Sequence, residues 1–177
     1  MNPTLEKELI DKYPEIFMFN NISSFDFEHN DGWYFIIDAF FYGLVSEARR
    51  ARNHYLFSIE KATYKDIINA IKLPDADCIQ NDKLDYWNQC LNEIPKPFQI
   101  KEKFGELRIY MDNTNKIFDS LESMALALSK NTCEYCGLMN HSVMLYPIDW
   151  HKTLCDSCSD KAYGGKAIKF RANKTNG

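Results

Sequence analysis

Four of the six cysteines form the pattern with the clearest chemistry. Cys133, Cys136, Cys155 and Cys158 are spaced as C-x2-C-x18-C-x2-C. Two cysteines three positions apart can turn their sulfurs toward one point in a tight turn, and Gly137 tolerates the positive φ that such a turn needs. Two such turns build a tetrahedral shell of four thiolates with no position left open for water. The spacing therefore predicts one structural Zn²⁺ ion.

Other interpretations of the two Cys-x2-Cys pairs are weaker. Disulfides need an oxidising compartment, and the chain starts without the basic and apolar segments of a signal peptide. A thioredoxin-like redox pair would be a single motif in a βαβ unit. His141 and His151 lie between the pairs and could each replace one cysteine as a ligand. Four cysteines already complete the shell, so we expect neither histidine to bind the metal.

A second candidate pair consists of Asp38 and Arg108. Asp38 lies in an otherwise apolar helical segment, where an unpaired carboxylate would be costly to bury. Arg108 lies on the polar side of a predicted strand and can satisfy a carboxylate with two parallel hydrogen bonds. We expect a structural ion pair, whose loss would cost about 3–5 kcal/mol. The alternative is that both side chains line a ligand-binding cleft.

The C-terminal end of the chain is basic. It contains no acid after residue 160 and five basic residues, which are Lys161, Lys166, Lys169, Arg171 and Lys174. The whole chain has a net charge of −4, so the preceding part carries −9. This tail could contact a few phosphates with weak, salt-sensitive affinity, and Phe170 could stack on a base. No recognition helix with clustered Arg, Asn or Gln is evident in the acidic part.

Hydrophobic periodicity predicts the elements that must position these residues. Helices are expected at 4–13, 33–52, 63–72, 84–94 and 115–130, with an edge strand near 25–28 and a β-hairpin over 98–111. The hairpin turns at Phe104-Gly105 and would place Phe98, Ile100 and Glu102 on one face. Such a mixture predicts an α+β fold, mainly helical, with a zinc-ribbon module after it. The expected parts are an α+β body at 1–130, a zinc ribbon packed on it at 131–162 and a basic tail at 163–177.

The surfaces of two helices can be predicted in more detail. The segment 33–52 is apolar nearly all round, which predicts a buried core helix preceded by an N-cap carboxylate in the Asn30-Asp31-Gly32 turn. Arginines near its end cap the helix or form a small anion-binding patch; they are Arg49, Arg50 and Arg52. The helix at 115–130 is expected to bury Ile117, Leu121, Met124, Ala125 and Leu128.

The insert between the cysteine pairs is rich in apolar side chains. Residues 138–150 have few charges and include Met139, Met144, Leu145, Tyr146, Ile148 and Trp150. We expect these side chains to pack the ribbon onto the helix at 115–130, and the alternative is that they form a binding patch for a partner.

Composition limits the class of protein. The chain has 177 residues and 45% hydrophobic residues, enough for one domain with a core and a small appendage. It contains no apolar run long enough to cross a bilayer. With no signal peptide evident, we expect a cytoplasmic protein.

Three blocks of sequence resemble one family. They are Asp31-Gly32-Trp33-Tyr34, the stretch from Gln99 to Tyr110 with the sequence QIKEKFGELRIY, and Cys133-x2-Cys136-Gly137 followed by Trp150-His151-Lys152-Thr153-Leu154-Cys155. In this order they resemble small, uncharacterised proteins encoded by bacteriophages and prophages, over most of the chain except 57–97. The resemblance implies a cytoplasmic zinc-ribbon protein of phage or mobile-element origin, and it implies no activity.

Several functions compete at this stage. The first is a non-enzymatic binding protein that acts on a host protein, for example a defence component. The second is a nucleic-acid-binding zinc-ribbon protein, which would use the basic tail. A degenerate HNH-like nuclease is a remote alternative, since only His151 could serve as a general base there. A protein that sequesters a small nucleotide would need a phosphate-binding loop, and Gly164-Gly165 lacks that context.

Overall fold

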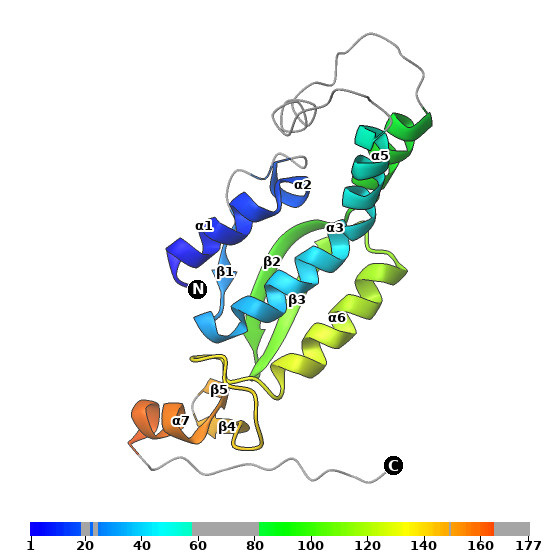
Figure 1. Ribbon diagram of the computed structural model, residues 1–177. Helices are drawn as coiled ribbons and strands as arrows, with labels where there is room; N and C mark the ends of the chain where they lie inside the picture. The colour runs from blue at the N-terminus through cyan, green and yellow to red at the C-terminus, as the bar shows by residue number, and fades with distance from the viewer. Residues whose placement is uncertain (19–21, 23–24, 58–81, 149, 165–177) are drawn as a thin grey trace, which may run out of the picture.

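The computed structural model describes residues 1–18, 22, 25–57, 82–148 and 150–164. Within these residues the protein is α+β, as the sequence predicts, and its element order is shown in Figure 1. The helices are α1 (Pro3–Lys12), α2 (Pro14–Phe17), η1 (Asp31–Trp33), α3 (Tyr34–Phe57), α5 (Asp82–Asn92), α6 (Lys116–Ser129) and α7 (Asp156–Tyr163). The strands are β1 (Phe27–Glu28), β2 (Lys96–Lys103), β3 (Glu106–Asp112), β4 (Met144–Ile148) and β5 (Trp150–Leu154). The helix expected at 63–72 lies outside the described residues.

Local signals account for the ends of the helices. The Asn2 side chain accepts a hydrogen bond from the Thr4 amide and caps α1, and Pro14 then starts α2. The Asn115 side chain accepts hydrogen bonds from two amides of the first turn of α6. Before α3, however, the Asp31 carboxylate does not act as the expected cap. It accepts a hydrogen bond from the Asn2 amide instead, which ties the start of α1 to η1.

The main sheet has the order β1-β2-β3. The short edge strand β1 runs parallel to β2, with Phe27 opposite Ile100, and β2 and β3 form the predicted antiparallel hairpin. The turn at Phe104-Gly105 takes positive φ at both residues, which suits the right-handed twist of the strands. A register shift between Pro97 and Gln99 marks a bulge in β2.

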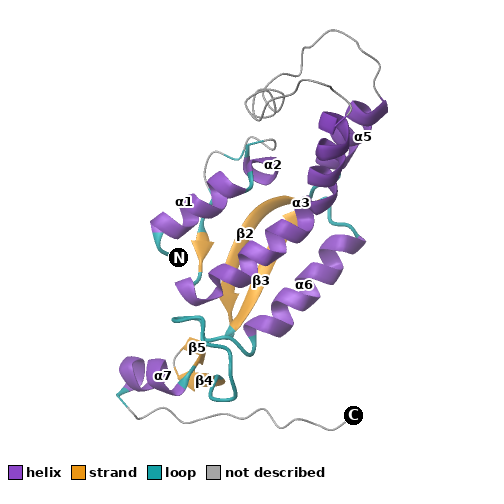
Figure 2. Cartoon of the chain, viewed as in Figure 1, coloured by secondary structure: helices purple, strands orange, loops and turns teal. Residues whose placement is uncertain are grey.

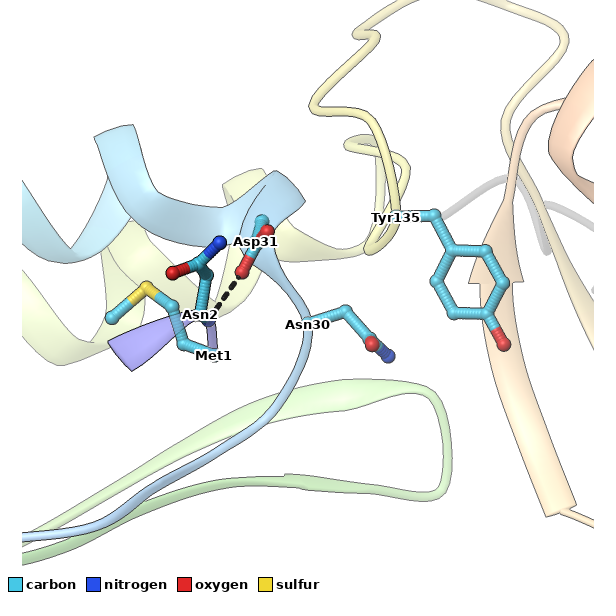
Figure 3. A pocket seen from close by; sticks show the side chains of 5 residues that line it. All are labelled: Met1, Asn2, Asn30, Asp31 and Tyr135. Atoms are coloured by element: carbon cyan, nitrogen blue, oxygen red, sulfur yellow. Dashed lines mark hydrogen bonds between the residues drawn. The ribbon is translucent and has the colours of Figure 1, made fainter. Parts of the chain in front are cut away.

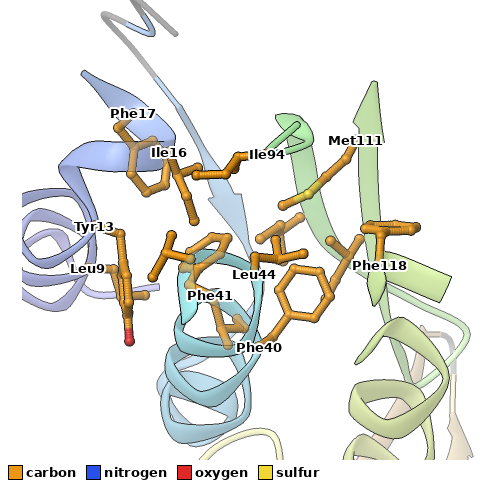
Figure 4. Packing of buried hydrophobic residues seen from close by; sticks show 14 of the residues in the cluster. Leu9, Tyr13, Ile16, Phe17, Phe40, Phe41, Leu44, Ile94, Met111 and Phe118 are labelled. Atoms are coloured by element: carbon orange, nitrogen blue, oxygen red, sulfur yellow. The ribbon is translucent and has the colours of Figure 1, made fainter. Parts of the chain in front are cut away.

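Helices cover one face of this sheet and enclose the core (Figures 1 and 2). Side chains from α1, α2, α3, α6 and all three strands form a single buried cluster. Aromatic rings dominate it: Phe41 packs edge-on against Phe17 at 5.5 Å, and Phe40 packs against Phe118 at 5.9 Å (Figure 4). α5 packs against the C-terminal half of α3, where Trp87 lies 5.8 Å from Tyr55.

Two predictions about buried helix faces are wrong in part. α3 is not buried all round, because Phe35 is 78% exposed and Tyr42 is 59% exposed. On α6, Ile117 and Met124 are exposed, and Phe118 enters the core instead. Apolar periodicity locates a helix but does not distinguish its packed face from an adjacent apolar stripe.

The C-terminal module, residues 131–164, lies at the turn end of the β2–β3 hairpin (Figure 1). It consists of the loop after α6, the antiparallel hairpin β4–β5 and α7. Leu145 and Thr153 approach Gly105 so closely that a side chain there would collide with Leu145. The Thr153 hydroxyl also donates a hydrogen bond of 2.6 Å to the Gly105 carbonyl. In the described part of the chain, no helix has the length and apolar character needed to cross a membrane.

Candidate metal centre

The structure brings the four predicted cysteines together. One ligand atom from each of Cys133, Cys136, Cys155 and Cys158 lies within 4.8 Å of all the others. The cysteines are not joined as disulfides, and Cys136 Sγ lies 3.7 Å from Cys155 Sγ. A metal ion with four bonds of about 2.3 Å in a tetrahedron separates its sulfur ligands by about 3.8 Å. This arrangement can hold one metal ion.

Each pair of cysteines is positioned by its own local structure. In the first pair, the Gly137 amide donates to the Cys133 carbonyl at 2.9 Å, and Gly137 has the predicted positive φ. In the second pair, Cys155 is the N-cap residue of α7 and Cys158 follows one turn later. The sulfurs of this pair therefore lie at the start of α7, where the helix dipole favours negative charge.

Other metal ligands are not found beside the cysteines. Among the described residues, these four form the single group of three or more His, Cys, Asp and Glu side chains that could hold a metal ion. His151 lies on β5, where its ring contacts Phe104. His141 lies in the exposed loop before β4. Neither histidine belongs to the cysteine cluster.

The C-terminal module has a small core of its own. Val143, Tyr146 and Leu154 are buried with Cys133 and Cys155, apart from the main core. The Tyr146 hydroxyl donates to Asp156 at 3.1 Å, which fixes β4 to α7. The expected packing of the insert onto the helix at 115–130 is therefore wrong for Tyr146. Leu138 and Met139 are exposed.

The loop that carries the first two cysteines is docked on the start of α3. The Gly32 amide donates to the Glu134 carbonyl at 2.7 Å, and the Trp33 indole Nε1 donates to the Thr132 carbonyl at 3.0 Å. The contact is tight: a Cβ added to Gly32 would lie 2.1 Å from the Cys133 carbonyl oxygen. A metal ion that holds this loop in place would also hold the backbone atoms against which the start of α3 packs.

A buried ionic network supports the same junction. Glu134, between the first two cysteines, is fully buried, and its Oε1 accepts hydrogen bonds from Asn30 Nδ2 at 2.7 Å and Lys152 Nζ at 2.9 Å. Lys152 also pairs with Glu102 at 3.0 Å. Burial alone would lower the pKa of Lys152, but the two glutamates outweigh it and raise that pKa. The network joins the body, the cysteine loop and β5.

Sequence reasoning missed this network. Two of its members, Asn30 and Glu134, are 104 positions apart in the sequence. The one local signal for the network is that Glu134 lies between two cysteines whose sulfurs must point toward the metal site. A charged residue there needs a partner, but the sequence does not indicate which one.

The expected Asp38–Arg108 pair does not form. Asp38 Oδ1 accepts from the Tyr13 hydroxyl at 2.6 Å and lies 2.7 Å from Lys12 Nζ, so its partners are at the end of α1. Arg108 pairs with Glu106 on its own strand at 2.5 Å. The prediction failed because α1 covers the side of α3 that carries Asp38, whereas Arg108 lies on the outer face of the sheet and pairs with Glu106.

The other predicted cations have simple surroundings. Arg49 pairs with buried Glu15 through two hydrogen bonds of 2.8 and 3.0 Å, and Arg52 lies 3.7 Å from the same carboxylate. Arg50 pairs with Glu47. These carboxylates favour the structural interpretation of the arginines over the anion-binding patch. Lys161 is exposed on α7, and the rest of the basic tail, Lys166, Lys169, Arg171 and Lys174, lies outside the described residues.

Two shallow pockets lie near the start of α3. The first, of about 330 Å³, is lined by Met1, Asn2, Asn30, Asp31 and Tyr135 (Figure 3). In that view Tyr135 forms one wall, and Asp31 faces Asn2 on the other side. The second pocket, of about 390 Å³, shares Asp31 and extends between α1 and α3 to Phe35. The two pockets have Asp31 in common.

Comparison with known proteins adds no further identification: no family model, no curated protein and no solved structure matches this chain.

Proposed function

We propose that the four cysteines bind one Zn²⁺ ion with a structural role. Four thiolates are the donor set of closed structural zinc sites, and their observed separations are compatible with that ion. When bound, the ion would hold the loop after α6 against the start of α7. Elemental analysis of protein prepared without chelator should find one zinc per chain, and Cys136→Ser should abolish it. Iron, or no metal at all, would contradict the proposal.

We further propose that the protein is a non-enzymatic binding protein that acts on another protein. The observation that carries this proposal is an apolar surface beside the metal centre. Phe35 and Tyr135 line the two pockets that share Asp31, while the exposed Leu138 and Met139 follow the first cysteine pair. Contiguous exposed apolar patches are uncommon on a free surface, and aromatic and Met side chains are enriched where proteins bind each other.

The structural basis of this surface also favours binding. Phe35 is on the first turn of α3 and Tyr135 is between two cysteines, so both are held by the docked loop and its buried ionic network. Rigid side chains lose little conformational entropy when a partner binds. The resemblance to phage and prophage proteins leads us to propose a host protein as the partner and the cytoplasm as the location.

Site-specific photo-crosslinking tests the proposal. A photoreactive residue at position 35 or 135, in full-length protein expressed in host cells, should give one discrete adduct with a host protein. The same residue at position 117 on α6 serves as a matched control, because the 53% exposure of Ile117 lies between the 78% of Phe35 and the 40% of Tyr135. Phe35→Asp should remove the adduct formed from position 135, because both positions border one surface. Equal adducts from positions 35, 135 and 117 would contradict the proposal.

A further inference from the structure

The outer face of the main sheet is the largest feature that the metal centre and the proposed protein-binding surface do not explain. The helices pack on the inner face, where Ile100, Leu107 and Ile109 are buried. Side chains of the opposite face are exposed or half-buried. The outward set consists of Glu28, Phe98, Gln99, Lys101, Lys103, Glu106, Arg108 and Tyr110.

The bulge in β2 places an aromatic ring on this face. Without it, Phe98 would point inward with Ile100, as the alternation of the sequence predicts. The register shift between Pro97 and Gln99 turns Phe98 outward, and its side chain is 59% exposed. Its ring lies 5.8 Å from that of Tyr110 on β3, at an interplanar angle of 34°. The two rings, tilted against each other, form an aromatic platform near one end of the hairpin.

A second aromatic group lies at the other end. Phe104 is 63% exposed at the hairpin turn, and its ring lies 5.9 Å from that of His151 on β5. Its φ of +57° is a conformation that bulky side chains rarely adopt and that Asn or Gly adopts readily. An exposed Phe in this position costs stability and buries little surface. Such a residue is expected where its ring has a role in binding.

Cationic side chains lie between the two aromatic groups. Lys101 Nζ lies 5.3 Å from the centre of the Tyr110 ring, and Lys103 Nζ lies 5.5 Å from that of Phe104. Neither lysine forms a salt bridge with a described carboxylate. On this face Glu106 is already shared by Arg108 and Lys130, and Glu28 accepts a hydrogen bond from Gln99. In the strand register Glu28 lies opposite Lys101 and Glu106 lies opposite Lys103, so the outward set, with Arg108, carries three positive and two negative charges.

We propose that the outer face of the β2–β3 hairpin binds single-stranded nucleic acid. Bases would stack on the Phe98–Tyr110 platform and on Phe104, and the backbone phosphates would contact Lys101 and Lys103. Stacking needs only the π-face of a base, so this binding would have little sequence preference. The six residue steps from 98 to 104 span about 20 Å of strand, which allows two separated bases to be held at once. An exposed sheet whose aromatic rings stack two or three bases is an established way of binding single strands.

Fluorescence anisotropy with labelled oligonucleotides of about 12 nucleotides, as single-stranded DNA and RNA, tests the proposal. Phe98→Ala and Phe104→Ala should each weaken binding by about five-fold or more. Lys101→Ala with Lys103→Ala should reduce the slope of log K against log salt by about 1.4, the value for two phosphate contacts on a single strand. All four side chains are at least partly exposed, so the fold should persist in these variants.

Matched controls use exposed residues of the helical side. Tyr42→Ala removes an exposed aromatic ring from α3, and Lys7→Ala with Lys116→Ala removes two charges from α1 and α6. These variants should bind as tightly as the original protein. Phe104→Asn should raise the melting temperature and at the same time weaken oligonucleotide binding. If Phe104 had only a structural role, the variant would not combine higher stability with weaker binding.

A deletion distinguishes nucleic-acid binding by the sheet from binding by the basic tail. Deletion of residues 165–177 should leave most of the single-strand affinity and its dependence on Phe98 and Phe104. Loss of binding on this deletion, with no effect of the hairpin variants, would overturn the proposal in favour of the tail. Equal affinity for duplex and single strands, binding of an acidic peptide in place of the oligonucleotides, or no binding at about 50 mM salt would also overturn it.

Discussion

Gly32 is the residue on which the contact between α3 and the cysteine loop depends. It has no room for a side chain, because the nearest atoms are backbone atoms of Cys133 and Glu134. Backbone atoms cannot rotate away as a side chain can, so any larger residue must push the loop off α3. The absence of a side chain at Gly32 therefore allows the first cysteine pair to keep its conformation while it packs against the start of α3.

Gly32→Ala should lower the free energy of unfolding by about 3 kcal/mol, through overpacking and the loss of the hydrogen bond to Glu134. Urea unfolding, followed by tryptophan fluorescence, measures this. Gly43→Ala is the matched control within α3, since its new Cβ would meet only atoms of the flexible Leu121 side chain. That variant should lose clearly less stability, and equal losses would show that the backbone contact is not decisive.

His29 makes stability depend on pH. The ring is buried between Phe27 and Trp33, Nδ1 lies 2.7 Å from the Asn30 carbonyl oxygen, and Nε2 has no hydrogen-bond partner among the described residues. Burial lowers the pKa of His29 to about 4, and the Met1 ammonium and Lys152 also lower it. The Asn30 carbonyl and Asp31 act in the opposite direction. The neutral imidazole is thus the form that fits the folded protein.

Since the unfolded chain binds this proton near pH 6.5, stability should fall as the pH drops from 6.5 toward 4. Between pH 7 and pH 5 the loss attributable to His29 should be about 2 kcal/mol. His29→Phe keeps a buried ring and should remove that part of the pH dependence. Urea unfolding of both proteins at the two pH values is the measurement. Parallel pH profiles would mean that other groups cause the acid sensitivity.

At the residue scale, the sequence predicted the four cysteines and Gly137 because ligand spacing and positive φ are local properties. It did not predict the partners of Glu134, Asp38 or Arg108. Those partners depend on which elements become neighbours, and a carboxylate accepts any cation that packing brings within reach. The sequence contains 21 Lys and Arg residues, so charge alone could not identify Lys12 as the partner of Asp38.

At the scale of elements, periodicity located α1, α3, α5, α6 and the β2–β3 hairpin, but it predicted neither α2 and α7 nor the β4–β5 hairpin. It failed at the bulge in β2, because one extra residue reverses the side of Phe98 without changing the sequence pattern. It also failed on the exposed sides of α3 and α6, where apolar side chains lie beyond the packed stripe. Alternation and helical spacing describe regular geometry, so a local irregularity or a functional apolar surface escapes them.

Asp38 connects two of these elements, α1 and α3. Asp38→Asn should lower the free energy of unfolding by about 1 kcal/mol, which is well below the cost expected for a buried pair. The carboxylate is partly exposed, and the Tyr13 hydroxyl can still donate to the amide oxygen of the variant. Double-mutant cycles check the partners: Asp38 and Lys12 should couple, and Asp38 and Arg108 should be additive. Coupling to Arg108 would restore the pairing that the sequence suggested.

At the scale of the whole molecule, two apolar clusters are joined by polar contacts. The large cluster lies between the helices and the sheet, and the small one includes Cys133 and Cys155. The junction consists of the hydrogen bonds of Gly32 and Trp33, the Glu134 network and the contact of Thr153 with Gly105. The body therefore keeps its own core if the metal is lost, but the first turn of α3 loses its partner.

Removal of the metal by a chelator should affect the chain unevenly. Amide hydrogen exchange should accelerate throughout residues 131–164 and at Gly32, whose amide bonds to Glu134. Protection should persist in the middle of α3 and in β2 and β3, which belong to the large cluster. Exchange that accelerates equally in both clusters would show that they unfold as one unit. Restoring zinc should restore protection.

The distance along the chain between α3 and its partner loop has a consequence for synthesis on the ribosome. Asn30 and Glu134 are 104 positions apart, so at about 5–20 residues per second the loop is made about 5–20 s after the segment that it caps. During that interval the nascent chain can form the α3 helix and β2–β3, but the Gly32 amide and the Trp33 indole have no partner. Binding of the proposed metal ion would then be a late step of biogenesis, because its four cysteines all follow the segments that form the body.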